Sequence, residues 1–164
     1  MILGLDPSFR ATGWVIADDS GLVLNAGCIS TTPKKGVRPQ HDDLRRIRIL
    51  RDGLKHLGRS YPITQCSSEL LGGSQSSRAA RSLGIASALV EASFPWCDIV
   101  YVEPRAVKLA MTGNPNASKR MMVNVARRYQ SLGQLMDGKT VVACEAIADA
   151  LGVLVASELV QVRG

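Results

Sequence analysis

The chain has 164 residues, 46% of them apolar and 4% aromatic, so it is long enough for one domain with a core built mainly from Val, Ile, Leu and Ala. Its net charge of +6 and pI of about 9.5 make a polyanion, most commonly nucleic acid, the expected partner. Its cysteines contain no C-x₂-C pair, which argues against a zinc site and favours reduced thiols in a cytosolic protein.

The first part of the chain predicts three strands joined by tight turns, over residues 1–5, 13–17 and 22–29. The run Asp18-Asp19-Ser20-Gly21 is typical of a hairpin turn. Residues 31–40, which include two prolines and a pair of lysines, predict a loop. Residues 41–57 predict a helix, because apolar side chains recur there at helical spacing: Leu44, Ile47, Leu50, Leu54 and Leu57.

The rest of the chain alternates between helices and strands. Strands are expected at 63–68 and 98–102, with a helix of small residues at 74–93 between them. A short helix should follow Pro104, and Ser118 can cap a helix that runs to about residue 132. Gly138 closes a turn before a last, largely apolar helix over 141–160. This order predicts an α/β protein, a single domain over 1–164 with a mixed five-stranded sheet whose first three strands are antiparallel, flanked by helices.

The two ends of the chain predict a protein of the cytoplasm without membrane association. The N-terminus lacks the basic region and the long apolar segment of a signal peptide. The apolar run over 141–160 carries acidic residues, so we expect a buried helix there and no membrane span.

Four carboxylates stand in or beside apolar segments, where an unpaired charge costs on the order of several kcal/mol. Asp6 ends the first strand, Glu69 follows the fourth, and Glu145 and Asp149 interrupt the last helix. A spacing of four residues places the last two on one helix face, where like charges repel. If the three segments converge, Mg²⁺ would offset these charges, which predicts metal-dependent chemistry on phosphate.

Each of these acids also has a purely structural explanation. Asp6 could form the turn after its strand, and Glu69 could lie in a solvated loop. Glu145 and Asp149 could form a polar stripe on a partly buried helix. The two histidines lie far from any paired partner, so a histidine-based nucleophilic site has little support.

A series of motifs in chain order resembles the RuvC-type Holliday junction resolvases, a family of ribonuclease H-like nucleases, with a phage-type member as one option. The first strand and hairpin are similar at residues 2–8 (ILGLDPS) and 12–14 (TGW). The second acid and the family's dimer helix are similar at 68–69 (SE) and 78–84 (RAARSLG). The two lysine segments and the closing acidic helix are similar at 104–108 (PRAVK), 117–119 (ASK) and 148–151 (ADAL).

The chain departs from the family pattern at three places. Ser8 stands where the family commonly has glycine, in the turn after Asp6. Ala146 stands where an aspartate usually precedes the final one, and Glu145 lies one step earlier. The aromatic wedge after the second acid is replaced by residues 70–72 (LLG), which bears on selectivity for four-way junctions more than on cleavage.

The resemblance implies a ribonuclease H-like fold and Mg²⁺-dependent hydrolysis of DNA phosphodiesters, with Mn²⁺ as a substitute, leaving 5′-phosphate and 3′-hydroxyl ends. Asp6, Glu69, Glu145 and Asp149 would bind the metals. Lys119, with Lys108 as the alternative, would neutralise charge at the scissile phosphate. The location would be the cytoplasm of a bacterium or of a phage-infected host cell.

The resemblance also implies branched DNA as the partner and a homodimer, because two symmetric cuts need two active sites. The small-residue segment 79–92 would form the twofold interface, which the resemblance favours over the alternative of packing within one chain. Basic residues in loops and helix starts near the acids are candidates for phosphate contacts, namely Lys34, Lys35, Arg38, Arg78, Arg81, Arg105, Lys108, Lys119 and Arg120. Each could also be a solvated surface cation.

Two other functions fit parts of the sequence. An actin-like sugar or acetate kinase also opens with a strand, an aspartate and a hairpin, but 164 residues are too few for its two lobes. A catalytically inactive, ribonuclease H-like module that binds branched DNA is the main alternative, and the presence of all four acids argues against it.

Overall fold

The computed structural model describes residues 1–70, 76–129 and 132–160. Five strands form one sheet: β1 (Ile2–Asp6), β2 (Ala11–Ala17), β3 (Val23–Ser30), β4 (Gln65–Glu69) and β5 (Ile99–Val102). Their order is β3-β2-β1-β4-β5, in which the first three strands are antiparallel and β4 and β5 run parallel to β1. The mixed five-stranded sheet predicted from the sequence is confirmed.

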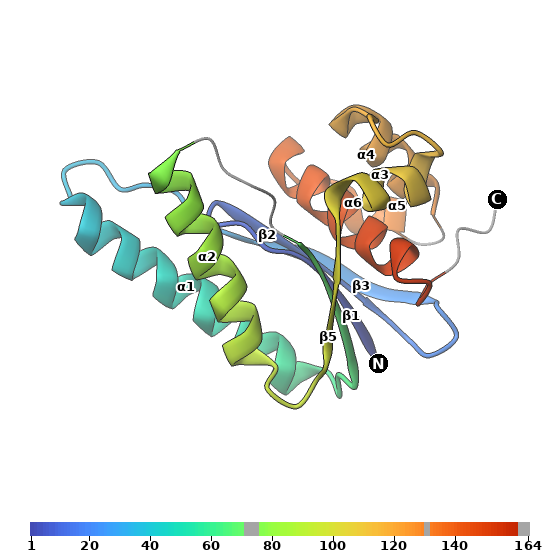
Figure 1. The fold of residues 1–164 in the computed structure, drawn as a ribbon, viewed down its shortest axis with the longest axis horizontal. Coiled ribbons are helices and arrows are strands. Elements are labelled where there is room, and N and C mark those ends of the chain that lie inside the picture. Colours follow the sequence, from blue (N-terminus) through green and yellow to red (C-terminus); the bar gives the residue numbers. More distant parts are fainter. Residues whose placement is uncertain (71–75, 130–131, 161–164) are drawn as a thin grey trace.

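Helices cover both faces of this sheet (Figure 1). One face carries the long helix α1 (Pro39–Ser60) and α2 (Ser77–Ser93). The other carries α3 (Pro104–Thr112), α4 (Lys119–Arg128), α5 (Leu132–Met136) and α6 (Val141–Ala156). The molecule therefore has three layers, with the sheet in the middle.

Two apolar cores follow from the alternation of side chains along the strands. Leu3, Leu5 and Ile16 point to the α1 and α2 side, where they pack with Val90 and Phe94. Residues of the same strands with the opposite orientation, Ile2 and Val15 among them, pack against α3 to α6. Both faces of β1 and β2 are thus buried, which explains why these strands are almost continuously apolar.

Several predicted boundaries differ from the structure. The helix expected to run from residue 118 to about 132 is two helices, α4 and α5. The last helix ends at Ala156 and not at 160, because Glu158 adopts a left-handed conformation (φ 61°). The N–H groups of Leu159 and Glu158 then donate back to the carbonyls of Leu154 and Val155, both at 3.1 Å. The predicted start of α2 at residue 74 lies outside the described residues.

The predicted buried face of α1 is wrong at one position. Leu44 is 53% exposed, whereas Arg46 is only 7% exposed. The Arg46 guanidinium lies 4.2 Å from the centre of the Phe9 ring and donates to the Phe9 carbonyl at 3.0 Å and to the Thr31 hydroxyl at 2.9 Å. These contacts satisfy the buried charge, and apolar periodicity has no means of predicting them.

No helix in the described ranges combines the length and the apolar character needed to cross a membrane.

Candidate active site

Two of the four acids lie at the same edge of the sheet. β1 and β4 are parallel neighbours, with Leu5 beside Ser68, so Asp6 and Glu69 both stand at the carboxyl ends of adjacent strands. Ligand and catalytic sites of sheets with parallel strands commonly form at such ends. Asp6 also pairs with Gly13 of β2, which places it beside the hairpin.

Helix α6 brings the other two acids to this edge because its backbone lies directly on the sheet. A Cβ atom at Gly13 would fall 1.9 Å from the Ala146 carbonyl oxygen, and one at Gly4 would fall 2.5 Å from that of Ala150. Only glycine permits this approach. The helix begins at Thr140, whose hydroxyl accepts from the Ala143 N–H at 3.3 Å, and its polar face carries Glu145 and Asp149.

The acids converge on one pocket of about 470 Å³. Its lining includes all four acids and two lysines from α3 and α4: Asp6, Glu69, Glu145, Asp149, Lys108 and Lys119. The structure therefore brings together every residue predicted to be catalytic or metal-binding, from β1, β4, α3, α4 and α6.

Burial and mutual repulsion raise the pKa of three of these acids. For Asp6, burial raises the pKa well above its usual range, and the charges of Glu69 and Asp149 add to this. Burial, with the charge of Asp149, raises the pKa of Glu69 to about 7. Burial raises the pKa of Asp149 to about 6, with Lys119 acting in the opposite direction and Glu145 adding to the rise. For all three acids burial is the largest cause, and the charges of neighbouring acids add to it.

Lys119 is a pocket lysine that forms an ion pair with one of the acids. It is the first residue of α4, after Ser118, whose hydroxyl caps the helix by accepting from Met121 N–H at 3.3 Å. Its Nζ lies 3.1 Å from Glu145 Oε2. Burial lowers the pKa of Lys119, but the hydrogen bond to Glu145 and the charges of Glu145, Asp149 and Asp6 outweigh it and raise the pKa. Lys119 therefore stays protonated beside the acids.

The donor set suits a hard divalent metal, although the carboxylates are not gathered around one point. All four acids offer the oxygen ligands that Mg²⁺ prefers. In the described part of the chain, no three Asp, Glu, His or Cys side chains lie close enough together to form a coordination shell. Glu145 is instead paired with Lys119. The residues fit a metal chemically, and binding would require the carboxylates to move inward.

Comparison with known proteins identifies the family. The family model described as crossover junction endodeoxyribonuclease RuvC matches residues 2–157, nearly the whole chain. The chain belongs to this RuvC family. The predicted resemblance and the predicted enzyme class are confirmed by this membership. The family is one of metal-dependent nucleases.

Individual relatives agree with the family model. RuvC of Anaeromyxobacter sp. (strain Fw109-5) is 32% identical over 126 residues, which cover 76% of this chain and 60% of that protein. RuvC of Granulibacter bethesdensis is 29% identical over 159 residues, covering 94% and 82%. The chain thus spans less than two thirds of the length of the Anaeromyxobacter relative.

Solved structures support the fold. T. thermophilus RuvC, in complex with a Holliday junction substrate, has a TM-score of 0.72 at 17% identity, covering 96% of this chain and 92% of that one. The yeast mitochondrial Holliday junction resolvase has a TM-score of 0.61 at 8% identity, covering 94% and 76%. The ribonuclease H-like fold expected from the resemblance is confirmed.

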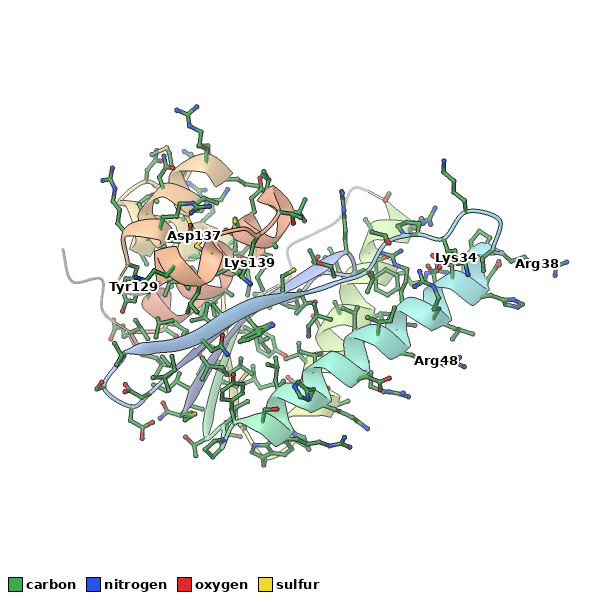
Figure 2. All side chains as sticks on the ribbon, turned by 180° about the vertical axis from the view of Figure 1, so that it is seen from behind. Lys34, Arg38, Arg48, Tyr129, Asp137 and Lys139 are labelled. Atoms are coloured by element: carbon green, nitrogen blue, oxygen red, sulfur yellow. The ribbon has the colours of Figure 1, made fainter. Side chains whose placement is uncertain are left out.

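The predicted DNA-contacting residues of this RuvC-type chain lie at different distances from the acids. Lys108 and Lys119 line the pocket itself. Arg78 and Arg81 lie in the first turns of α2, where Arg81 forms an ion pair with Asp43. Arg120 lines a separate cavity, and Glu145 is also part of the lining of that cavity. The other four are exposed, Arg105 on α3 and three residues in the loop before α1, namely Lys34, Lys35 and Arg38. Figure 2 shows Lys34 and Arg38 at the outer end of that loop, away from the helices around Asp137.

Among the charged residues that line the pocket, sequence reasoning missed one. Arg10, in the turn between β1 and β2, lines it and is exposed. Its position two residues after Ser8, within the motif that carries Asp6, was the available signal.

Proposed function

We propose that this RuvC-type protein is a structure-selective endonuclease that resolves Holliday junctions or related branched DNA by paired nicks, leaving 5′-phosphate and 3′-hydroxyl ends. The observation that carries the proposal is the convergence of four carboxylates and two lysines in one pocket of a chain with a net charge of +6. A cluster of acids in a basic protein is suited to holding metal ions against a polyanion.

The proposed metal ligands are Asp6, Glu69, Glu145 and Asp149, with Mg²⁺ as the ion and Mn²⁺ as its substitute. When bound, such ions would supply an activated water and stabilise the leaving oxygen. Lys119 has a further role in this proposal. Its ammonium, which lies 3.1 Å from Glu145, would neutralise charge on the scissile phosphate. Lys108 lines the same pocket and is the alternative for this role.

The partner and assembly belong to the same proposal. The basic residues predicted from the sequence would contact phosphates, and two protomers would pair through α2. Several small residues of this helix are exposed, including Ala80, Gly84 and Ala88, which suits a close helix pair. We also propose that residues 1–164 form a single nuclease domain that acts in the cytoplasm.

A cleavage assay with a matched variant tests this function. The wild-type protein and Asp149→Asn would each be incubated with four-way, three-way, flap and linear DNA, with Mg²⁺ and without it. We expect metal-dependent cleavage of the four-way junction by wild type. The cleavage rate of Asp149→Asn should be at least ~100-fold lower, because the substitution removes a proposed metal ligand itself and not a side chain that supports a ligand. Its affinity for the junction should stay within ~3-fold of wild type.

The same assay separates the alternative of a catalytically inactive module. The Lys119–Glu145 ion pair favours that alternative, because it neutralises part of the acid cluster without any metal. An inactive module would bind the junction but leave every substrate uncut with either Mg²⁺ or Mn²⁺. Normal cutting by Asp149→Asn would instead show that the metal ligands are wrongly assigned.

A further inference from the structure

A second cavity, of about 420 Å³, adjoins the catalytic pocket. Both cavities are lined by Ser8, Arg10 and Leu83, so they share the turn that follows Asp6 and one side of α2. A strand of nucleic acid that passes through the catalytic pocket therefore has a continuous path into the second cavity.

The two cavities differ in charge. The catalytic pocket combines four acids with cations. The described residues that line the second cavity include three arginines and no acid, namely Arg10, Arg46 and Arg78. Arginine guanidinium groups without a competing carboxylate are well suited to bind phosphate.

Arg46 forms part of the wall of the cavity, and its guanidinium is already hydrogen-bonded to other residues of the protein. Arg46 is buried, and its N–H groups donate to the Phe9 carbonyl and the Thr31 hydroxyl at 3.0 and 2.9 Å. Its guanidinium also covers the Phe9 ring at 4.2 Å. A base therefore cannot stack on that face of Phe9, so this cavity is suited to a backbone phosphate and not to a base.

The other two arginines are available to a ligand. Arg10 and Arg78 are exposed, and neither forms an ion pair with another residue that the structure describes. Arg81, by contrast, is paired with Asp43. Arg10 lines both cavities, and this position suits it to contact a phosphate beside the one being cleaved.

We propose that the second cavity is a phosphate subsite that holds a backbone phosphate next to the scissile one, with Arg10 and Arg78 as its ligands. Arg46 is a positioning residue, because it fixes the backbone of the turn that presents Arg10. The inference rests on the proposed nuclease function, and it assigns to Arg10 the placement of the cleaved strand over the acids.

The test measures binding of a four-way DNA junction as a function of salt, in metal-free buffer so that the DNA stays intact. The proteins are wild type, Arg10→Gln, Arg78→Gln and the control Arg48→Gln. Arg48 is also exposed, but it points outward from α1 and lines neither cavity (Figure 2). All four proteins should have similar melting temperatures, since each replaced side chain lies at the surface.

We expect Arg10→Gln and Arg78→Gln each to weaken binding by ~10-fold at low salt. Each should also reduce the slope of log K against log salt by ~0.7–0.9, the change for one lost phosphate contact. Arg48→Gln should keep the wild-type slope. Arg10→Lys should restore part of the affinity, because lysine keeps the charge without the paired donors.

The two ways of failing are distinguishable. If wild type neither binds nor cuts branched DNA, the proposed function is wrong. If wild type cuts the junction but Arg10→Gln keeps the wild-type slope, the function stands and the subsite is wrong. Equal slope losses in Arg10→Gln and Arg48→Gln would also overturn the subsite, since they would reflect overall charge alone.

Discussion

Glu145 is the acid at which this chain departs from the RuvC family pattern. Its surroundings allow a direct test of its proposed role as a metal ligand. Its side chain is 25% exposed, lines the pocket that contains the four acids and pairs with Lys119 at 3.1 Å. Asp137 is a close counterpart, since it pairs with Arg127 at the same distance but is 72% exposed and lies outside the pocket. The two acids thus form comparable ion pairs in different places.

Glu145 and Asp137 can therefore be compared in a matched experiment. Glu145→Ala should reduce the cleavage rate by ~100-fold, because it removes a proposed metal ligand and leaves Lys119 without its partner. Asp137→Ala should stay within ~2-fold of wild type, as an exposed ion pair contributes little. Rates would be compared at saturating junction and Mg²⁺. Similar rates for the two variants would mean that Glu145 is a surface acid.

The raised pKa values of the acids predict how stability depends on pH in the absence of metal. Asp6, Glu69 and Asp149 hold their protons to higher pH in the folded protein than in the unfolded chain, where their pKa is near ~4. Their contribution to stability is therefore complete below that value. It is lost as the pH rises through about 6 for Asp149 and about 7 for Glu69.

Thermal melts would test this dependence. In EDTA the melting temperature should fall by on the order of 5 °C between pH 5 and pH 8. Added Mg²⁺ should raise it at pH 8 far more than at pH 5, because the metal binds the ionised carboxylates. Asp149→Asn should flatten the profile. A melting temperature that rises with pH in EDTA would contradict the assigned pKa directions.

At the scale of elements, the placement of α6 on the sheet decides whether the site forms. The helix carries two of the four acids, and glycines of β1 and β2 let its backbone approach β1, which carries Asp6, and the neighbouring β2. The site is therefore sensitive to any side chain added under α6.

Gly13→Ala should displace α6. The added Cβ would lie 1.9 Å from a backbone oxygen, which cannot rotate away as a side chain would. We expect a loss of ~1–3 kcal/mol in the free energy of unfolding together with a large loss of cleavage. Gly84→Ala in α2 is the control, since its Cβ meets nothing within 4 Å and alanine favours a helix. Denaturant titration and cleavage rates would compare the two variants.

At the scale of the whole molecule, the proposed resolution of a junction by paired nicks needs two active sites. The surface best suited to pair two copies is the exposed small-residue side of α2, whose N-terminal turns also line the proposed phosphate subsite. Dimer formation would thus place two basic surfaces beside one another, in keeping with a branched polyanion as substrate.

Gly84→Glu tests this assembly, because the open space at Gly84 allows the side chain in a monomer but not between two packed helices. We expect a monomer by light scattering, with a melting temperature unchanged within a few degrees, against a dimer for wild type and for Gly84→Ala. The Glu variant should lose paired cuts within one junction and retain only uncoupled nicks. A wild-type monomer that still makes paired cuts would refute the dimer.

The sequence determined much of the fold because periodicity and turn residues are local signals. The five strands, the antiparallel hairpins and the helices α1, α3 and α6 follow from apolar spacing, prolines and caps. The four acids could also be selected from the sequence, because a carboxylate in an apolar segment needs a compensating cation wherever the chain places it.

Only the tertiary structure decided how these parts meet. Local sequence patterns do not predict that α6 crosses the sheet over Gly4 and Gly13. This crossing brings Asp149 close to Asp6. Nor do local patterns predict that Arg46 is buried while Leu44 is exposed, since its partners Phe9 and Thr31 lie 37 and 15 residues away along the chain. The same holds for Arg10, whose place between two cavities depends on helix α2 and on the strand ends together. Contacts between distant segments set the charge and shape of the site, and these arise only when the chain is folded.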